Sequence, residues 1–547
     1  MATSFVVGVD VGSRSARAAL VTLRGNLVRK ADRPLEVREQ KGEIFEQNAD
    51  QIWNAICECV REVVSSVSVD DIKGIGFDAT CSLAIVDVEG RPVSVSADGD
   101  DRFNVIMWCD HRARDEAELI NRGGYQVLRR VGGRISPEME PPRLLWLKRH
   151  MPHSFQRIKH AFDLPDYLTY RATGSLSRSL CSLTCKWTYD AQKGWDKAFW
   201  REIGLEEIAD NPEIIGKQNE VRYPGDFLGT LSKNAVKDLG LSSQTKVGAS
   251  VIDAHAGVLG MLGAFAKGVS SEPTTRLCLI AGTSTCHMLL SKKEIFVNGV
   301  WGPYEGAIFP NLYLAEAGQS ASGMFLDHLL MTHSRYNEAL ENSKRFGLHI
   351  VEFVTQILEN MASSNRCSVD ELTKDLHVYP DYHGNRSPLA DPNMRGMISG
   401  LELSNTEEDL AILFLAGVQA LAYQTKQIVD QLEKQGHRVE SLLLCGGLIN
   451  NPLYVAAHAN VLQRPVLVPD ENEVVLIGAA VLAARALGCF QDLWESMREM
   501  SGRATIRWPD QAVAELHSRR YKAFLILLDC QLAIRKVMNP IERASAY

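Results

Sequence analysis

A single carboxylate followed by small residues is the first candidate for chemistry in this chain of 547 residues. Asp253 ends the apolar run 247–252 and precedes the segment Ala254-His255-Ala256-Gly257. This pattern predicts a strand end that runs into a helix with little side-chain bulk around the carboxylate. Because a substrate hydroxyl can then come close, Asp253 is the candidate base that accepts its proton.

A second carboxylate, Asp10, lies near the end of the predicted buried strand 5–12. The turn Gly12-Ser13-Arg14-Ser15 and then Arg17 follow it. Backbone N–H groups and hydroxyls in such a turn bind phosphate groups, and Asp10 can hold Mg2+ directly or through water. Arg14 either contacts a phosphate or points outward, and the sequence leaves both open. An ordinary hairpin with a polar tip is the alternative for the whole stretch.

The same layout of strand, turn and strand recurs far along the chain. Residues 276–281 are expected to form a strand that enters the turn Gly282-Thr283-Ser284, and residues 287–290 a second strand. This single repetition predicts two related domains that face each other, not a solenoid. We expect an N-terminal domain over 1–265, a C-terminal domain over 266–490 and a helical extension over 491–547.

Two groups of side chains are candidates for contact with a polyol. The segment Trp108-Cys109-Asp110-His111-Arg112 can bind by hydrogen bonds and stacking, although a helix start capped by Asp110 is an equal alternative. Lys186 stands alone among the apolar and hydroxyl residues of 180–189. Since a buried lysine needs a partner, Lys186 is either exposed or in contact with a polar ligand.

A glycine pair follows the predicted strand 441–445 in the segment Gly446-Gly447-Leu448-Ile449-Asn450. Glycines let a flat ring lie against the backbone, and Asn450 or Asn451 offers a hydrogen bond to that ring. A strand-to-helix turn without a special role is the alternative.

The composition favours a soluble globular protein of two domains. The net charge of -8 argues against a nucleic-acid surface. The twelve cysteines include no Cys-x-x-Cys pair, and Cys181 and Cys185 lack a second pair at metal-site spacing, so reduced, mostly buried thiols are expected. No apolar run is long enough to span a membrane, and no leader is recognisable, so a cytoplasmic location is expected.

In order and spacing, these segments resemble the FGGY family of carbohydrate kinases from Val6 to about Ala484. A narrower likeness to the ribulokinase branch, most of all to its members assigned as D-ribulokinases, lies in residues 80–83, 181–187 and 316–320. The motifs that carry the family resemblance are Asp10 to Arg17, Trp108 to Arg112, Pro142 to Trp146, Asp253 to Gly257, Gly282 to Ser284, Gly396 to Leu401, and Gly446-Gly447.

The resemblance implies an α/β fold of two actin-like, ribonuclease H-like domains, each a mixed sheet flanked by helices, with an active-site cleft between them. It implies ATP and Mg2+ as cofactors and transfer of the γ-phosphate to the C5 hydroxyl of D-ribulose. A small sugar is the expected partner, without nucleic acid or membrane, and a homodimer is the candidate assembly. Another ketopentose or pentitol (L-ribulose, xylulose or ribitol) is the first alternative, and a non-catalytic actin-like protein that binds ATP and sugar is the second.

The resemblance also assigns residues. Asp253 is the catalytic base and Asp10 the metal ligand. Arg143 stands where the family usually has lysine, which affects no catalytic group. ATP is expected at Gly12, Ser13, Arg14, Ser15, Arg17, Gly282, Thr283, Ser284, Gly318, Gln319, Gly446, Gly447 and Asn450. The sugar is expected at Thr80, Cys81, Asp110, Lys186, Asp253 and Glu316.

Overall fold

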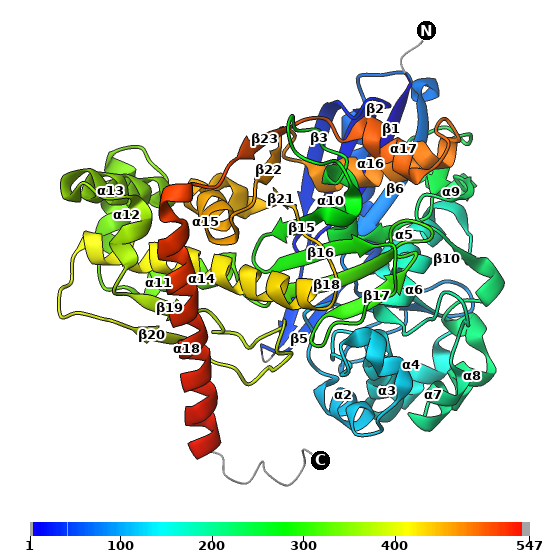
Figure 1. The fold of residues 1–547 in the computed structure, drawn as a ribbon. Helices are drawn as coiled ribbons and strands as arrows, with labels where there is room; N and C mark the ends of the chain where they lie inside the picture. Colours follow the sequence, from blue (N-terminus) through cyan, green and yellow to red (C-terminus); the bar gives the residue numbers. More distant parts are fainter. Residues whose placement is uncertain (1–3, 41, 539–547) are drawn as a thin grey trace. The chain divides into compact units, whose positions relative to one another are not determined.

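The computed structural model describes residues 4–40 and 42–538, and Figure 1 labels its helices and strands. The chain divides into two compact units. Unit 1 comprises Met1–Phe265, Met288–Glu316 and Pro469–Arg503. Unit 2 comprises Ala266–His287, Ala317–Val468 and Ala504–Tyr547. Each unit is therefore built from three separate stretches of chain, whereas the expected limits at 265 and 490 cut the chain twice. Those limits stay a prediction.

The main sheet of unit 1 carries both Asp10 and Asp78. Its strand order is β12-β13-β6-β1-β2-β3, and β14 pairs with the end of β6. Strand β1 is antiparallel to β2 and parallel to β6, so that Asp10 lies opposite Arg17 on one side and Asp78 on the other. The strands are β1 (Phe5–Val11), β2 (Ser15–Thr22), β3 (Leu27–Pro34), β6 (Ile72–Ala79), β12 (Phe227–Thr230), β13 (Lys246–Gly248) and β14 (Val251–Ile252).

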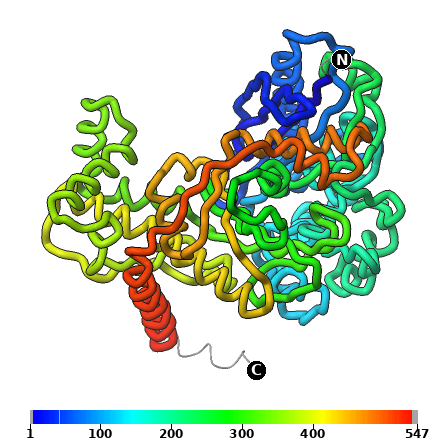
Figure 2. Tube along the Cα trace, turned by 45° about the horizontal axis from the view of Figure 1, so that its top comes forward, coloured from blue at the N-terminus to red at the C-terminus, as the bar shows by residue number. Residues whose placement is uncertain are grey.

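Helices cover both faces of this sheet. Helix α1 (Ala49–Val64) packs on β2 and β3, and α16 (Val474–Leu487) packs on β1 and β6. The backbone of α16 approaches very closely, because a Cβ on Gly8 would lie 2.2 Å from the Leu476 carbonyl oxygen. Figure 2 shows α16, in orange, beside the blue strands that begin the chain. The small residues of α16 therefore serve close packing.

A second, antiparallel sheet of unit 1 leads into the segment 108–112, a candidate for sugar contact. Its order is β4-β5-β8-β7-β9. The strands are β4 (Arg38–Gln40), β5 (Ile44–Gln47), β7 (Leu83–Val86), β8 (Val105–Ile106) and β9 (His160–Asp163). Further elements of this unit are α2 (Arg114–Asn121), α3 (Glu140–His150), α4 (Pro152–Arg157), α5 (Leu164–Thr173), β10 (Arg178–Ser179), α6 (Leu180–Lys186), α7 (Lys197–Glu202), α8 (Glu206–Asp210), β11 (Val221–Arg222), α9 (Lys233–Leu239), β17 (Trp301–Glu305) and α17 (Leu493–Met500).

The strand expected before Asp253 is interrupted in the structure. Strands β13 and β14 are separated by Ala249 and Ser250. The Ala249 backbone bonds instead to Gly225 and Asp226, and the Ser250 hydroxyl donates to an Asp166 carboxylate oxygen at 3.0 Å. The prediction of one continuous strand was wrong, but helix α10 (Asp253–Met261) begins at the expected residue.

Unit 2 is built on the parallel strands β15 (Arg276–Ala281), β21 (Ser441–Cys445) and β22 (Val466–Pro469), paired in that order. Helix α14 (Glu407–Lys434) also belongs to this unit, and the predicted helical extension contains α18 (Ala514–Met538). The other helices and strands are α11 (Gly323–Thr332), α12 (Tyr336–Arg345), α13 (Ile350–Asn365), β19 (His377–Tyr379), β20 (Met397–Ser399), α15 (Pro452–Leu462) and β23 (Ala504–Arg507). Strands β16 (Thr285–Ser291) and β18 (Tyr313–Gln319) pass from one unit to the other.

Within residues 4–40 and 42–538, no helix has the length and apolarity needed to cross a membrane.

Candidate active site

Three carboxylates converge at one edge of the main sheet of unit 1. Asp10 and Asp78 are neighbours across parallel strands, and Val251, two residues before Asp253, pairs with Asp78. The charges of Asp10 and Asp253 both act on Asp78. Because the carboxyl ends of parallel strands meet at the same edge of a sheet, the topology itself brings these groups together.

Arg17 is the cation that partners Asp10. Its Nε donates to Asp10 Oδ2 at 2.6 Å, and its Nη2 pairs with the same oxygen. A second contact joins Arg17 Nη1 to Glu473 Oε2 at 3.1 Å. Glu473 directly precedes α16, and sequence analysis gave no reason to place it here. Arg17 thus lies among carboxylates, and its expected contact with ATP stays a prediction.

Asp253 occupies the first position of α10 and is half-buried, so that a ligand can reach it. Its Oδ1 accepts a hydrogen bond from the Ala254 N–H at 2.7 Å. Burial and then the charge of Asp10 raise the pKa of Asp253 to about 6. The carboxylate is therefore ionised at neutral pH and yet more basic than an ordinary aspartate, as a general base requires.

Asp78 is a member of the cluster that sequence reasoning missed. It is fully buried, and neither carboxylate oxygen has a hydrogen-bond partner in the part of the chain described. Burial, reinforced by Asp10, raises its pKa well above the usual range. Its place at the end of a second buried strand, matching that of Asp10, was the signal that could have found it.

The predicted phosphate turn and the predicted sugar segment are joined by a hydrogen bond. The Trp108 indole Nε1 donates to Ser13 Oγ at 2.8 Å. The Trp108 backbone N–H donates to Ser82 Oγ at 3.2 Å, and that hydroxyl lies 3.0 Å from Thr80 Oγ1. Trp108 therefore links the turn after β1 to the segment after β6. Arg14 in that turn has an exposed side chain.

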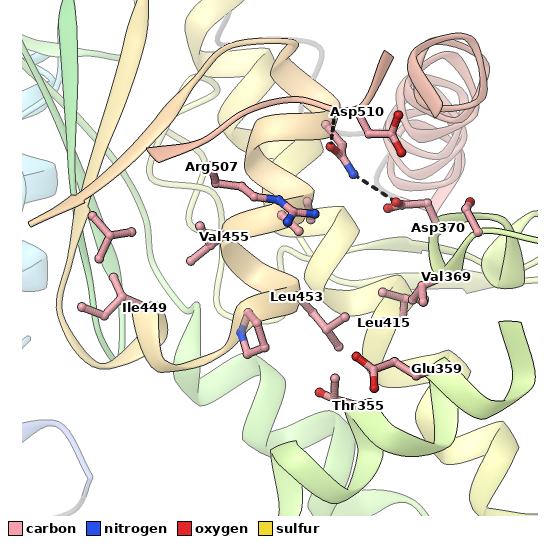
Figure 3. Close-up of a pocket in the computed structure, with 16 residues that line it drawn as sticks. Thr355, Glu359, Val369, Asp370, Leu415, Ile449, Leu453, Val455, Arg507 and Asp510 are labelled. Carbon is pink, nitrogen blue, oxygen red and sulfur yellow. Dashed lines mark hydrogen bonds between the residues drawn. The ribbon is translucent and has the colours of Figure 1, made fainter. Parts of the chain in front are cut away.

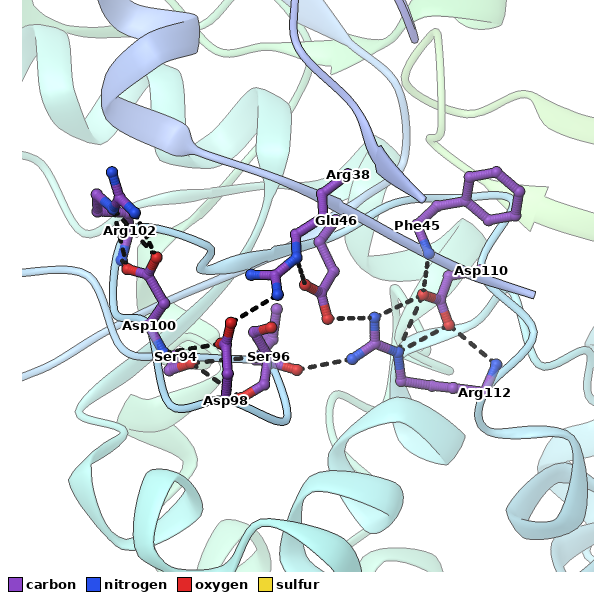
Figure 4. Close-up of polar contacts among 11 residues, drawn as sticks. Arg38, Phe45, Glu46, Ser94, Ser96, Asp98, Asp100, Arg102, Asp110 and Arg112 are labelled. Atoms are coloured by element: carbon purple, nitrogen blue, oxygen red, sulfur yellow. Dashed lines mark hydrogen bonds and ion pairs between the residues drawn. The ribbon is translucent and has the colours of Figure 1, made fainter. Parts of the chain in front are cut away.

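Asp110 organises the loop that carries it, as Figure 4 shows. Its carboxylate accepts from the Phe45 N–H at 2.7 Å and from Arg112 Nη2 at 2.7 Å, and the side chain is buried. Arg112 also donates to Glu46 at 3.0 Å. Asp110 does not cap α2, which begins after Ala113. These bonds give Asp110 a positioning role, and a direct contact with sugar stays a prediction.

A fully buried ion pair supports the same loops. Arg143 Nη1 lies 3.0 Å from Glu140 Oε1, and both side chains have no exposed surface. Arg143 Nη2 donates to the Met107 carbonyl at 2.8 Å and to the Trp108 carbonyl at 3.1 Å. Lysine cannot reproduce this fork of donors, so the departure from the family's usual lysine has a structural consequence here.

Lys186 is buried, so the alternative of an exposed side chain is wrong, and its contact with a polar ligand stays a prediction. Its Nζ lies 4.6 Å from the centroid of the Trp301 ring, close enough for a cation–π interaction. The charges of Lys186 and Asp253 act on each other. Glu316 is buried within the same unit, and Cys81 is partly exposed.

In unit 2 the predicted phosphate turn is closed by an internal backbone bond, as its counterpart in unit 1 is, although the bond in unit 2 spans one residue fewer. The Gly282 N–H donates to the Ser284 carbonyl at 2.8 Å, as the Gly12 N–H donates to the Ser15 carbonyl at 3.0 Å. The Thr283 carbonyl accepts from the Ser322 N–H at 2.8 Å, while the Thr283 side chain is exposed. Each turn thus presents hydroxyl groups from a fixed backbone.

Five residues of the set expected at ATP, those on the side of its adenosine, fall into two classes. Gly447 and Asn450 are exposed, and Gly446 has a positive φ of 92°. Gln319 instead is buried, and its Nε2 donates to the Leu421 carbonyl at 2.8 Å. Gly318 packs closely, since a Cβ there would lie 2.8 Å from the Thr285 carbonyl. An adenosine contact by any of them stays a prediction.

A pocket of about 550 Å³ opens in unit 2, and Figure 3 shows its lining. Ile449, Asp370, Asn460 and Arg507 are among the lining residues, but none of the residues expected at ATP is. Its polar wall is held internally, because Asn460 Nδ2 donates to Asp370 Oδ2 at 3.0 Å. We therefore assign this pocket no part in the chemistry.

Comparison with known proteins identifies the fold of both units. Residues 5–260 match the N-terminal domain model, and 277–487 the C-terminal domain model, of the FGGY family of carbohydrate kinases. An "FGGY carbohydrate kinase domain-containing protein" of Danio rerio is 46% identical over 97% of this chain and 98% of its own. The chain belongs to the FGGY family of carbohydrate kinases.

Two further similarities bear on this FGGY kinase. A Saccharomyces cerevisiae protein named D-ribulokinase is 38% identical and aligns over 91% of this chain and 74% of its own. The crystal structure of a gluconate kinase from Lactobacillus acidophilus superposes with a TM-score of 0.81 at 18% identity, covering 96% of this chain and 98% of that one. The predicted two-domain α/β fold with mixed sheets is confirmed.

The carboxylate cluster fits the magnesium ion that the family implies. Carboxylate oxygens are the ligands that Mg2+ prefers, and the buried oxygens of Asp78 lack a protein partner among the residues described. Arg17 makes both of its contacts to Asp10 at Oδ2, and neither of them occupies the other carboxylate oxygen, Oδ1. Asp10 is the candidate ligand, with Asp78 and Asp253 as neighbouring carboxylates.

Proposed function

We propose that this FGGY kinase transfers the γ-phosphate of ATP to the C5 hydroxyl of D-ribulose, giving D-ribulose 5-phosphate and ADP. The observation that carries the proposal is Asp253, a half-buried, basic carboxylate at the first position of α10. The relative named D-ribulokinase supports the choice of sugar.

Asp253 would accept the proton of the C5 hydroxyl as that oxygen forms its bond to the γ-phosphorus. The bond between the γ-phosphorus and the oxygen bridging to the β-phosphate breaks, and ADP leaves with the electron pair. The Ala254 N–H holds Asp253 Oδ1 at 2.7 Å and so fixes the orientation of the carboxylate. A fixed base needs no reorientation during the transfer.

The phosphate groups are proposed to contact the turns at Gly12–Ser15 and Gly282–Ser284 through N–H and hydroxyl groups. Such donors stabilise the charge that spreads over the transferring group. Mg2+, when bound at Asp10, would supply positive charge to the β- and γ-phosphates. Trp108 keeps Ser13 in place through the 2.8 Å hydrogen bond to its hydroxyl.

The sugar is proposed to lie against Lys186, Glu316, Thr80 and Cys81. Lys186 and Glu316 offer a donor and an acceptor from buried positions, and buried polar groups discriminate strongly between hydroxyl configurations. Lys186 is already placed by the Trp301 ring. The hydroxyl pattern that these groups prefer decides between D-ribulose and other pentoses.

A coupled assay of ADP release with magnesium-ATP tests the proposal. The rate of ADP release by the purified protein is measured with D-ribulose, L-ribulose, D-xylulose, L-xylulose, ribitol and glycerol in turn, each against a blank without sugar. We expect the highest kcat/KM with D-ribulose. A higher value with another pentose or pentitol would keep the kinase and replace the substrate.

Absence of sugar-dependent ADP release from folded protein would contradict the kinase proposal. Calorimetric titration with sugar and a non-hydrolysable ATP analogue then distinguishes a protein that binds both ligands without transfer from one that has another substrate.

A further inference from the structure

Two thiols and an imidazole meet in unit 1, next to the proposed catalytic residues. Cys181 and Cys185 lie four residues apart on α6, so their side chains share one face of the helix. His255 reaches the same place from α10. The three ligand atoms all lie within 4.8 Å of one another, and all three side chains are buried. Figure 1 labels both helices.

The spacing of these atoms is that of a metal site. Bond lengths of about 2.3 Å for Zn–S and about 2.0 Å for Zn–N in a tetrahedral site place sulfur and nitrogen about 3.6 Å apart. The distance from Cys185 Sγ to His255 Nε2 is 3.5 Å. The other two pairs lie within 4.8 Å. To reach tetrahedral separations, the two sulfurs need to close by at most about 1.0 Å and the other sulfur–nitrogen pair by at most about 1.2 Å.

The kind of ligand atom selects the kind of ion. Two sulfurs and an imidazole favour Zn2+, Cd2+ or Cu(I), whereas Mg2+ takes oxygen ligands such as those of Asp10. Three protein ligands leave a fourth tetrahedral position for water. The cluster is therefore distinct in chemistry from the magnesium position at the carboxylates.

All three side chains are buried. A metal ion displaces the thiol protons as it binds. Because the side chains have no exposed surface, binding requires local opening and is expected to be slow.

We propose that Cys181, Cys185 and His255 bind one thiophilic cation of the Zn2+ class and that its binding inhibits the kinase. Lys186 follows Cys185 directly, and Asp253 stands two residues before His255. Drawing α6 and α10 together at the ion displaces both groups, and a displacement of about 1 Å can lower a rate about 100-fold. The inhibition rests on the proposed kinase function, whereas the binding does not.

Cadmium serves as the probe, because its bonds to thiolates absorb in the ultraviolet. The parent is the full chain with Cys489→Ser and Cys530→Ser, which removes the two exposed cysteines. Reduced protein is incubated with Cd2+ for increasing times and freed of excess metal, and bound cadmium is measured by mass spectrometry. We expect one Cd2+ per chain with thiolate absorption, and at least tenfold less in Cys181→Ala.

Cys278→Ala is the matched control, since Cys278 is equally buried but lies in unit 2 outside the cluster. It is expected to bind cadmium as the parent does. If Cys181→Ala does not fold, His255→Gln replaces it. Equal cadmium content in parent and cluster variants, or no thiolate absorption in the parent, overturns the site.

Inhibition is measured on the same proteins as the ratio of ADP-release rates with and without Zn2+, at constant magnesium-ATP. We expect at least a tenfold decrease in the parent, reversed by EDTA, and less than a twofold decrease in Cys181→Ala. Binding without inhibition overturns the inhibitory part alone. Absence of ADP release in every sample contradicts the kinase proposal and leaves the cadmium result to decide the site.

Discussion

The Trp108 indole Nε1 donates a 2.8 Å hydrogen bond to Ser13 Oγ, joining the proposed sugar segment to the proposed phosphate turn. Trp108→Phe and Ser13→Ala each remove this bond and are expected to lower kcat/KM for ATP about fivefold, since such a bond contributes about 1 kcal/mol. Because both changes remove the same bond, the double variant is expected to lose less than the product of the single effects.

The control for this cycle is Trp195→Phe. Its indole donates a comparable 2.9 Å bond to the Gly216 carbonyl, away from the carboxylate cluster. Combined with Ser13→Ala, it is expected to give additive effects. Additive effects of the Trp108 and Ser13 changes would show that the bond does not couple the two segments.

Replacement of the proposed base separates chemistry from binding. Asp253→Asn keeps the shape of the side chain and its acceptor toward the Ala254 N–H but removes the basic oxygen. We expect kcat to fall about 100-fold or more, the scale of general-base catalysis, with little change in the KM values. The measurement is the steady-state rate of ADP release, made on variants whose circular dichroism spectrum matches that of the wild type. The control is Asp226→Asn, because Asp226 lies outside the cluster and accepts from the Tyr223 N–H. A near-normal kcat in Asp253→Asn would show that Asp253 is not the general base.

The pH dependence should report the same group. Asp253 must be ionised to accept a proton, and burial together with Asp10 raises its pKa to about 6. We therefore expect kcat/KM for the sugar to be constant above this value and to fall about tenfold per pH unit below it. Native circular dichroism at each assay pH excludes acid unfolding. A profile that stays flat well below the expected pKa would contradict the assignment.

Arg143 offers a test of the buried support. Arg143→Lys keeps the charge opposite Glu140 but cannot make the fork of bonds to the Met107 and Trp108 carbonyls. We expect the free energy of unfolding to fall by about 1–3 kcal/mol, as for buried groups left unpaired, and KM for the sugar to rise. Arg157→Lys, at a partly exposed pair with Asp101, should change stability by less than about 1 kcal/mol. Equal effects of the two substitutions would show that the buried fork contributes little.

Local patterns in the sequence predicted the elements around Asp253 better than their assembly. The helix start at Asp253 follows from the apolar run and the small residues after it. The break at Ala249 and Ser250 does not, because their bonding partners Gly225, Asp226 and Asp166 come from distant segments. That each unit is assembled from separate stretches of chain likewise depends on long-range packing. The close approach of α16 to the glycines of β1 and β6 is an example.

Side-chain roles divide in the same way. The spacing of Trp108 to Arg112 indicated a polar site. It did not indicate that the Asp110 carboxylate accepts hydrogen bonds from Phe45 and Arg112. His255 completes the cluster with Cys181 and Cys185 only because α6 and α10 meet in space. No local pattern carries that information, since the residues lie about 70 positions apart.

Asp78 gives a prediction that depends on stability alone. A carboxyl whose pKa is higher in the folded chain than in the unfolded chain lowers stability as the pH rises from the unfolded value toward the folded one. The pKa of Asp78 is raised well above the usual range by burial, then by Asp10. Asp78→Asn removes this loss, so its Tm relative to the wild type should increase with pH across the weakly acid to neutral range. The difference in the free energy of unfolding between the variant and the wild type can grow by at most about 1.4 kcal/mol per pH unit.

The control for Asp78 has the opposite sign. Asp87 accepts from the Glu89 and Arg91 N–H groups and from Arg91 Nε at 2.9 Å. These bonds hold its pKa below the usual value, so that its ionised form stabilises the fold and that contribution is lost as the pH falls through the folded pKa. Asp87→Asn should therefore cost more stability at neutral than at acid pH. Parallel Tm curves for Asp78→Asn and the wild type would mean that Asp78 titrates alike in the folded and unfolded chains. Its burial without a hydrogen-bond partner among the described residues makes that physically unfavourable.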